Sequence, residues 1–354
     1  MASATPAGPS PTRAAPSPSA AGRIPWLSVA FAAAVAAPFL GVGSTMGDQL
    51  RNIYIFSILA LGLNVVVGYA GMLNLGIAAF FGIGAYITGI LTVSQFPFQV
   101  GFWPAMAAAV VGAGIAGVIV AAPTLRLRGD YLAIVTLGFG EVIKFSIKNL
   151  ENITNGSRAL NPLPSPWLPG IAAEAWDQDY RFYYFLALVF LGAVVLLLRN
   201  LENSPVGRAW MAIREDELAA TCMGTNAALV KLSAFALGAA LAGLAGALYA
   251  VSLDQTGAPD SYTFNRSITV LCFLIIGGMG NIKGALLGTA VLMGYDNILT
   301  PLLDSWIQAS GSPVKFTDVK LIVFGLALIL MMRFRPEGIL PSERIALEMH
   351  EERS

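Results

Sequence analysis

The sequence has almost none of the residues on which hydrolytic and metal chemistry depends. It holds one histidine, His350, close to the C-terminus, and two cysteines, Cys222 and Cys272, in separate segments without metal-ligand spacing. We interpret both cysteines as structural thiols. The chain also lacks the patterns GxxxxGKS and GxxxxGKT, with which many proteins hold nucleotide phosphates. These absences predict a protein that is not an enzyme and has no metal site and no cofactor of its own.

Charged residues are also scarce. Asp, Glu, Lys and Arg make up 12% of the chain, with 21 acids and 21 bases, whereas 56% of the residues are hydrophobic. A low and balanced charge gives no reason to expect a nucleic-acid partner. Hydrophobic content this high is typical of a chain that crosses a membrane several times. The composition therefore predicts an all-α polytopic membrane protein.

The two ends of the chain differ from its middle. Residues 1–23 consist mostly of Ala, Pro, Ser and Thr, which predicts a disordered tail. The hydrophobic run 24–43 could be a signal sequence, but the many later runs favour a retained first helix. We expect one membrane domain over 24–341, followed by a charged cytoplasmic tail over 342–354.

Hydrophobic runs, most of them close to the length needed to cross a bilayer, recur along this domain. The ten expected segments lie at about 24–43, 52–70, 72–93, 101–122, 131–149, 181–198, 229–251, 266–279, 284–300 and 318–333. The pair 266–279 and 284–300 is short and joined only by GGMGNIK, which predicts a broken or re-entrant pair. Basic residues collect at 126–128, 199–231 and 333–344, and ten segments with both ends inside place all of these in the cytoplasm.

Residues 205–224, the cytoplasmic segment, are the most polar stretch between two hydrophobic runs. Ser204 is suited to cap a helix that begins at Pro205, Gly224 to end a second short helix, and Asn226 to cap the next hydrophobic segment.

On the first of these short helices, Val206, Trp210 and Ile213 share one apolar face. Such a helix is expected at the membrane surface, where it could also be a simple connector between two spans.

Several motifs, in one order along the chain, resemble the LivM-type permeases of branched-chain amino acid ABC importers. They are GYAGMLNLGIAAFFGIGAYITGIL, LRGDYLAIVTLGFGEVI, AIREDELAATCMGTNAALVKLSAFALGAALAGLAGALYA, SITVLCFLIIGGMGNIKGALLG and FRPEGILP. The resemblance that they carry spans nearly everything from residue 52 to 341. The resemblance implies a permease of the bacterial inner membrane that carries branched-chain amino acids.

The resemblance also implies partners and a coupling site. Such a permease pairs with a second, LivH-type permease, receives its solute from a substrate-binding protein, and contacts two cytoplasmic ABC ATPases that bind the ATP. The family's coupling motif is matched by Glu217, Ala219, Ala220 and Gly224. We expect the cytoplasmic segment to carry ATPase closure into the spans, with Arg214 and Glu217 as polar contacts and the two alanines allowing close approach.

Glu141 is the most informative ionisable residue within a hydrophobic segment. A carboxylate at bilayer depth is costly, so it is expected to face the bundle interior, a water-filled path or a partner. Lys144 follows three residues later and could simply pair with it. The sequence leaves a role in the solute pathway and an internal ion pair equally open.

Four further polar residues are candidates for the pathway. Asn64 and Thr136 lie inside hydrophobic segments, where each could instead make an interhelical hydrogen bond. Asn74 and Asn281 occupy similar Gly-rich stretches in the two halves of the chain, as in a weak internal repeat that marks a midplane pathway.

The sequence departs from the family pattern at five positions and so leaves the cargo open. Met72, Asn74 and Ile77 replace the usual Gln, Ser and His, and Ser157 and Arg158 stand where Pro and Asn are usual. Urea, short amides or other neutral amino acids are therefore alternative cargoes. A sugar-type ABC permease and an ion-coupled secondary transporter, which would show more intramembrane charges, are less well matched.

Overall fold

The computed structural model describes most of the membrane domain. The described residues are 43–97, 99–124, 130–166 and 180–309, with short pieces at 31, 34–36, 38, 325–326, 329–331, 333–335 and 338–340. Every regular element among them is helical, as the composition predicts. The tail 1–23, most of the first and last expected segments and the C-terminal tail lie outside the described residues.

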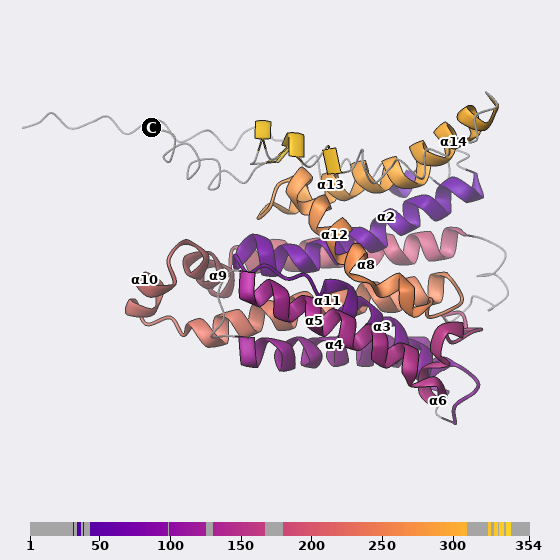
Figure 1. The fold of residues 1–354 in the computed structure, drawn as a ribbon, viewed down its shortest axis with the longest axis horizontal. Coiled ribbons are helices and arrows are strands. Elements are labelled where there is room, and N and C mark those ends of the chain that lie inside the picture. The colour runs from indigo at the N-terminus through magenta and orange to yellow at the C-terminus, as the bar shows by residue number, and fades with distance from the viewer. Residues whose placement is uncertain are drawn as a thin grey trace, which may run out of the picture.

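The bundle is built from long apolar helices (Figure 1). In the described ranges, four helices are long and apolar enough to cross a membrane, and a bent pair could add a fifth. The four are α2 (Ser44–Leu63) with its π-helical continuation η2 (Asn64–Tyr69), α4 (Phe102–Thr124), α8 (Arg181–Glu202) and α11 (Ala227–Ser252). The expected number of about ten is therefore not confirmed, although most of the expected segments have a helix at their place.

Two further expected segments form helices of a different character. α3 (Ile77–Thr92) is apolar but only 16 residues long. α5 (Asp130–Asn149) has 20 residues, yet it contains Glu141, Lys144 and Lys148. A span with charges inside it is expensive in lipid, so the surroundings of α5 decide whether it crosses the membrane against lipid or against protein.

The predicted broken pair is present as a sharp bend. α12 (Phe264–Gly277) and α13 (Ile282–Gly294) meet at an angle of 119°, and the chain continues into η5 (Tyr295–Leu299) and α14 (Thr300–Ala309). Gly278 has a φ of 117°, a backbone conformation open to glycine, which explains why the chain can turn here.

α11 is the central helix, packed against α2, α3 and α4. Its approach to α3 depends on the absence of side chains: a methyl group on Gly84 would overlap the Gly243 carbonyl, and one on Gly246 would overlap that of Phe81. Most of α11 is buried, while less than half of α4 and α8 is buried. Small residues at the contacts thus let these helices pack closely.

The two ends of the bundle carry short elements. α9 (Pro205–Glu215) and α10 (Glu217–Cys222) lie together at one end, beyond the long helices, and α6 (Glu151–Thr154) lies at the opposite end (Figure 1). The 3-10 turns η3 (Gly156–Arg158) and η4 (Pro259–Tyr262) belong to the loops that follow α5 and α11. The cytoplasmic segment and the loop 150–166 are therefore separated by the length of the bundle.

Candidate functional site

The predicted punctuation of the cytoplasmic segment is confirmed. Pro205 is the first residue of α9, and the Ser204 hydroxyl accepts a hydrogen bond from the Gly207 amide at 3.3 Å. Gly224 follows α10 with a φ of 88°, and the Asn226 side chain caps α11. These caps fix where each helix starts, so the segment consists of two rigid pieces rather than one loop.

Asp216 separates the two pieces, and the sequence reading missed it. Its Oδ1 accepts hydrogen bonds from the amides of Leu218 at 2.8 Å and Ala219 at 3.0 Å, which makes it the N-cap of α10. Aspartate is among the preferred N-cap residues, so the signal was available in the sequence. Asp216 therefore has a structural role as a helix cap.

The apolar face of α9 differs in part from the prediction. Trp210 and Ile213 are buried as expected, but Val206 is 43% exposed. Gly207 takes the inner position instead, so close to the preceding helix that a side chain there would overlap the carbonyl of Leu201. The Trp210 indole N–H lies within hydrogen-bonding distance of the Val230 carbonyl at 3.1 Å and the Ser233 hydroxyl at 2.9 Å, which fastens α9 to α11.

Both charges assigned to the coupling site have partners inside the chain. Glu217 Oε1 lies 2.6 Å from Lys231 Nζ, near the start of α11. Arg214 Nη1 donates to the carbonyl of Gly68, in the last turn of η2. Contacts from Arg214 and Glu217 to an ATPase remain a prediction, and each side chain already has a structural role.

Two large apolar side chains are exposed on α10 and directly after it. Leu218 is 74% exposed and Met223 87% exposed, and Ala219 and Gly224 are exposed as well. Ala220 is buried, so only the first of the two alanines is open to a partner. Leu218 and Met223 went unnoticed in the sequence because they do not follow the apolar face of either short helix.

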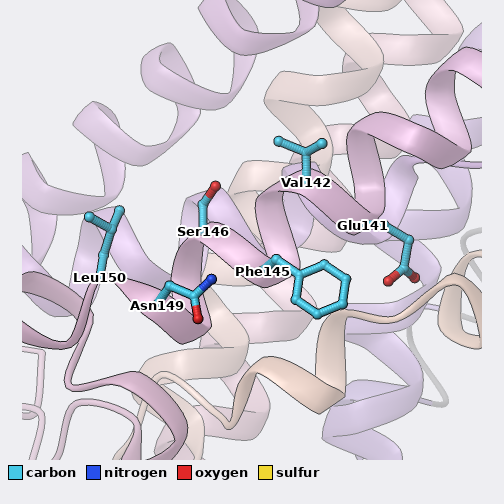
Figure 2. Close-up of a pocket in the computed structure, with 6 residues that line it drawn as sticks. All are labelled: Glu141, Val142, Phe145, Ser146, Asn149 and Leu150. Atoms are coloured by element: carbon cyan, nitrogen blue, oxygen red, sulfur yellow. The ribbon is translucent and has the colours of Figure 1, made fainter.

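The second candidate site lies on α5. Glu141 Oε2 is 3.7 Å from Lys144 Nζ, so the predicted pair forms, and Lys144 is also 4.0 Å from Asp260 in η4. Figure 2 shows Glu141 at one end and Leu150 at the other end of a row of side chains on one side of α5. Asp260 is far away in sequence, which is why the sequence did not reveal it.

The row on α5 borders an open hollow and mixes polar with apolar side chains. The lining residues are Glu141, Val142, Phe145, Ser146, Asn149 and Leu150. Val142 and Phe145 are exposed, and nothing lies near the point where Gly138 would carry a side chain. A carboxylate, a hydroxyl and an amide on the outward side of a membrane helix are costly against lipid tails. This face is therefore built for a partner or for water.

Asn64 and Asn281 hold the bend between α12 and α13. Asn64 is fully buried, and its Oδ1 accepts from the Gly280 amide at 2.9 Å. Asn281 caps α13 through the Lys283 amide at 3.0 Å and donates to the Leu340 carbonyl at 3.1 Å. Both amides support irregular backbone, and a contact of either with solute remains a prediction.

Asn74 and Thr136 hold the turn between η2 and α3. The Asn74 side chain accepts from the Gly76 amide at 2.9 Å, and Thr136 Oγ1 accepts from the Leu75 amide at 3.0 Å. Both side chains are buried within this chain. They join the turn to α5, so the α5 face and the end of η2 are connected through this short stretch.

The loops at the opposite end are tied to each other. Leu160 and Thr256 exchange two hydrogen bonds, with the Leu160 amide donating to Thr256 Oγ1 at 3.0 Å and the Thr256 amide to the Leu160 carbonyl at 3.1 Å. The buried Tyr262 hydroxyl donates to the Thr256 carbonyl. Burial raises the pKa of Tyr262 well above its ordinary value, so the phenol stays protonated and keeps this bond. The two loops thus form one surface.

Comparisons with known proteins agree with these features. The family described as "Branched-chain amino acid transport system / permease component" matches residues 45–332. No solved structure gives a significant match to the chain.

The relatives are permeases by name. The high-affinity branched-chain amino acid transport system permease protein LivM of Escherichia coli is 37% identical over 335 residues, 89% of this chain and 74% of that protein. A probable LivM of Methanocaldococcus jannaschii is 27% identical, with 82% of this chain and 92% of that protein covered. The LivH permease protein of Escherichia coli is 25% identical, with 84% and 93% covered. The chain therefore belongs to the family of permease components of branched-chain amino acid transport systems.

Proposed function

We propose that this chain forms one half of the solute pathway of an ATP-driven importer of the bacterial inner membrane, with branched-chain amino acids as cargo. A LivH-type permease supplies the other half, a substrate-binding protein delivers the solute, and two cytoplasmic ATPases bind ATP. The observation that carries the proposal is the family match, which covers nearly all of the described helices. The relatives include both LivM and LivH proteins, so a partner permease would share this fold.

The face of α5 supports a pathway between two permeases. Glu141, Ser146 and Asn149 line the open hollow beside exposed Val142 and Phe145. Polar groups at membrane depth are stable when they face a second protein or water. A path formed between two such faces would offer hydrogen bonds together with apolar surface, which suits an amino acid with an apolar side chain.

The end of the bundle that carries α9 and α10 supports an ATPase contact. Leu218 and Met223 are exposed there, in a segment too polar to lie in the lipid. Exposed apolar side chains on a rigid, capped element are suited to fill a groove on another protein. In this proposal the ATPases contact α10 by its apolar side chains, and the loops after α5 and α11 face the binding protein.

Uptake into proteoliposomes tests the proposal. The complex would contain this chain, a neighbouring permease, the ATPases and the binding protein. ATP would be supplied on the side of the vesicle membrane that carries the ATPases. We expect ATP-dependent uptake of labelled leucine that isoleucine and valine compete. Competition by urea or amides alone would replace the cargo, and uptake that is independent of ATP but abolished by an uncoupler would refute the importer.

A further inference from the structure

Arg214 lies where a helix end needs a hydrogen-bond donor. The last carbonyls of a helix have no following turn to bind them, and a cation at this end also interacts favourably with the helix dipole. α2 ends in the π-helix η2, in which Val65 and Val66 accept the amides of Ala70 and Met72. The Gly68 carbonyl, in the same turn, accepts from Arg214.

The stem of Arg214 makes a second contact with the same stretch. A side chain on Gly71 would lie 2.8 Å from Arg214 Cγ, and Gly71 has a φ of 67°, so only glycine combines this conformation with this approach. Arg214 therefore contacts the end of η2 at its guanidinium and along its stem. A lysine could repeat the stem contact, but not the planar set of donors.

α9 is held firmly on its other side. Trp210 is buried and bonded to α11, and Glu217 in α10 pairs with Lys231. A push on α10 therefore moves α9 and the start of α11 together. Arg214 is the side chain by which this unit also contacts the end of η2.

η2 in turn touches the bend between α12 and α13. Asn64 binds the Gly280 amide, and a side chain on Gly68 would lie 2.6 Å from that same nitrogen. The bend also binds the residues after the last segment, through the amides of Ile339 and Leu340. A continuous series of contacts thus runs from α9 through η2 to the bend, all of it at irregular backbone.

We propose that Arg214 is a positioning residue that links α9 to η2, so that a displacement of α9 by an ATPase also displaces the bend between α12 and α13. The inference rests on the proposed function, because it assumes that an ATPase moves α9. Arg214 acts here through a contact inside the permease, which differs from a direct contact with the ATPase.

The first test compares Arg214→Gln with Arg208→Gln in the reconstituted complex. Arg208 lies on the same helix but is exposed, and it donates to the carbonyl of Asn203 nearby in the chain. We expect Arg214→Gln to raise the ATP hydrolysed per solute imported by about fivefold or more, within the usual range of coupling between sites. Arg208→Gln should leave this ratio unchanged, and Arg214→Lys should lie in between.

Two results would overturn the inference. If Arg214→Gln lowers uptake and ATP hydrolysis in proportion, Arg214 serves ATPase docking or assembly, because the ratio stays constant. If Arg214→Gln behaves like Arg208→Gln, the contact has no role in coupling. Absence of ATP-dependent uptake in the native complex would instead count against the proposed function.

A distance measurement decides the matter without knowledge of the solute. Spin labels at Arg208→Cys and Lys283→Cys, in a Cys222→Ser background, report on α9 and the start of α13, both of which are exposed at these positions. We expect their separation to stay constant between ATP-bound and ATP-free complexes with Arg214 present, and to change in Arg214→Lys. A separation that responds to ATP equally in both proteins would refute the link.

Discussion

Two Glu–Lys pairs in this chain have the same chemistry and differ in their distance and in the elements that they join. Glu217 and Lys231 lie 2.6 Å apart, with side chains 28% and 10% exposed, and join α10 to α11. Glu141 and Lys144 lie 3.7 Å apart on the open face of α5, and Lys144 has Asp260 as a second neighbour. The exposures are similar, since the Glu141 and Lys144 side chains are 33% and 19% exposed, so the distance distinguishes the two pairs. A short pair between two helices stabilises their relative position, whereas a longer pair within one helix contributes little to stability. The first pair is therefore structural, and we expect the second to matter more for transport than for stability.

The largest expected effect comes from breaking the tight pair. Glu217→Gln leaves the buried Lys231 ammonium without its charged partner, and we expect a loss of about 2 kcal/mol in stability. Thermal unfolding of the purified protein in detergent measures the change. Glu215→Gln is the matched control, since Glu215 is exposed on the same segment. Equal melting temperatures for the two variants would contradict the structural role.

Exchanging the charges of the tight pair sharpens the same point. Glu217→Lys combined with Lys231→Glu restores an opposite pair, and we expect it to recover about 1 kcal/mol relative to the sum of the single variants. A double-mutant cycle in melting experiments gives this coupling directly. A coupling near zero would mean that the short distance reflects packing of the segment and not attraction.

Breaking the Glu141–Lys144 pair is expected to affect uptake more than stability. Glu141→Gln should change stability by less than about 0.5 kcal/mol, because the pair is partly exposed and long. Uptake should nevertheless fall about fivefold if the carboxylate faces the solute. Lys148→Gln, farther along α5 and exposed, is the control. If Glu141→Gln lowers stability as much as Glu217→Gln, the distinction between the pairs disappears.

The smallest expected effect is at Asp260. Its side chain is 77% exposed and 4.0 Å from Lys144, so the attraction is strongly screened. We expect Asp260→Asn to alter uptake by less than about twofold at low salt and not at all at high salt. Uptake measured at two ionic strengths checks this. A large effect that persists in high salt would give Asp260 a direct part in the solute path.

Local features of the fold could be predicted from the sequence, and long-range ones could not. The caps at Ser204 and Asn226, the break at GGMGNIK and the Glu141–Lys144 pair depend on residues a few positions apart, and each is present. The contact from Arg214 to Gly68 spans 146 positions, and no local sequence pattern predicts it. The same holds for the partners of Asn64 and Lys144.

The differences between the predicted and the observed helices have a common physical origin. Helical periodicity placed Val206 on the apolar face, but it does not tell how closely the neighbouring backbone approaches, and Gly207 takes the inner position. Hydropathy likewise predicted about ten segments, a number that is not confirmed, and among the described helices α3 is short and α5 carries charges that need a protein or aqueous neighbour. Hydrophobic periodicity describes one helix at a time, whereas packing between helices decides which side chains are buried.

The central position of α11 has a consequence for biosynthesis. It is the last of the four long helices to be made, yet it fills the space between α2, α3 and α4. Until residues 227–252 have been inserted, the glycine faces of the earlier helices have no partner. While α5, α8 and residues 205–224 are being synthesised, the surfaces of α2, α3 and α4 that pack against α11 therefore remain uncovered. A truncation anywhere before α11 would lack the helix against which α2, α3 and α4 all pack, and such a product is a natural target for membrane proteases.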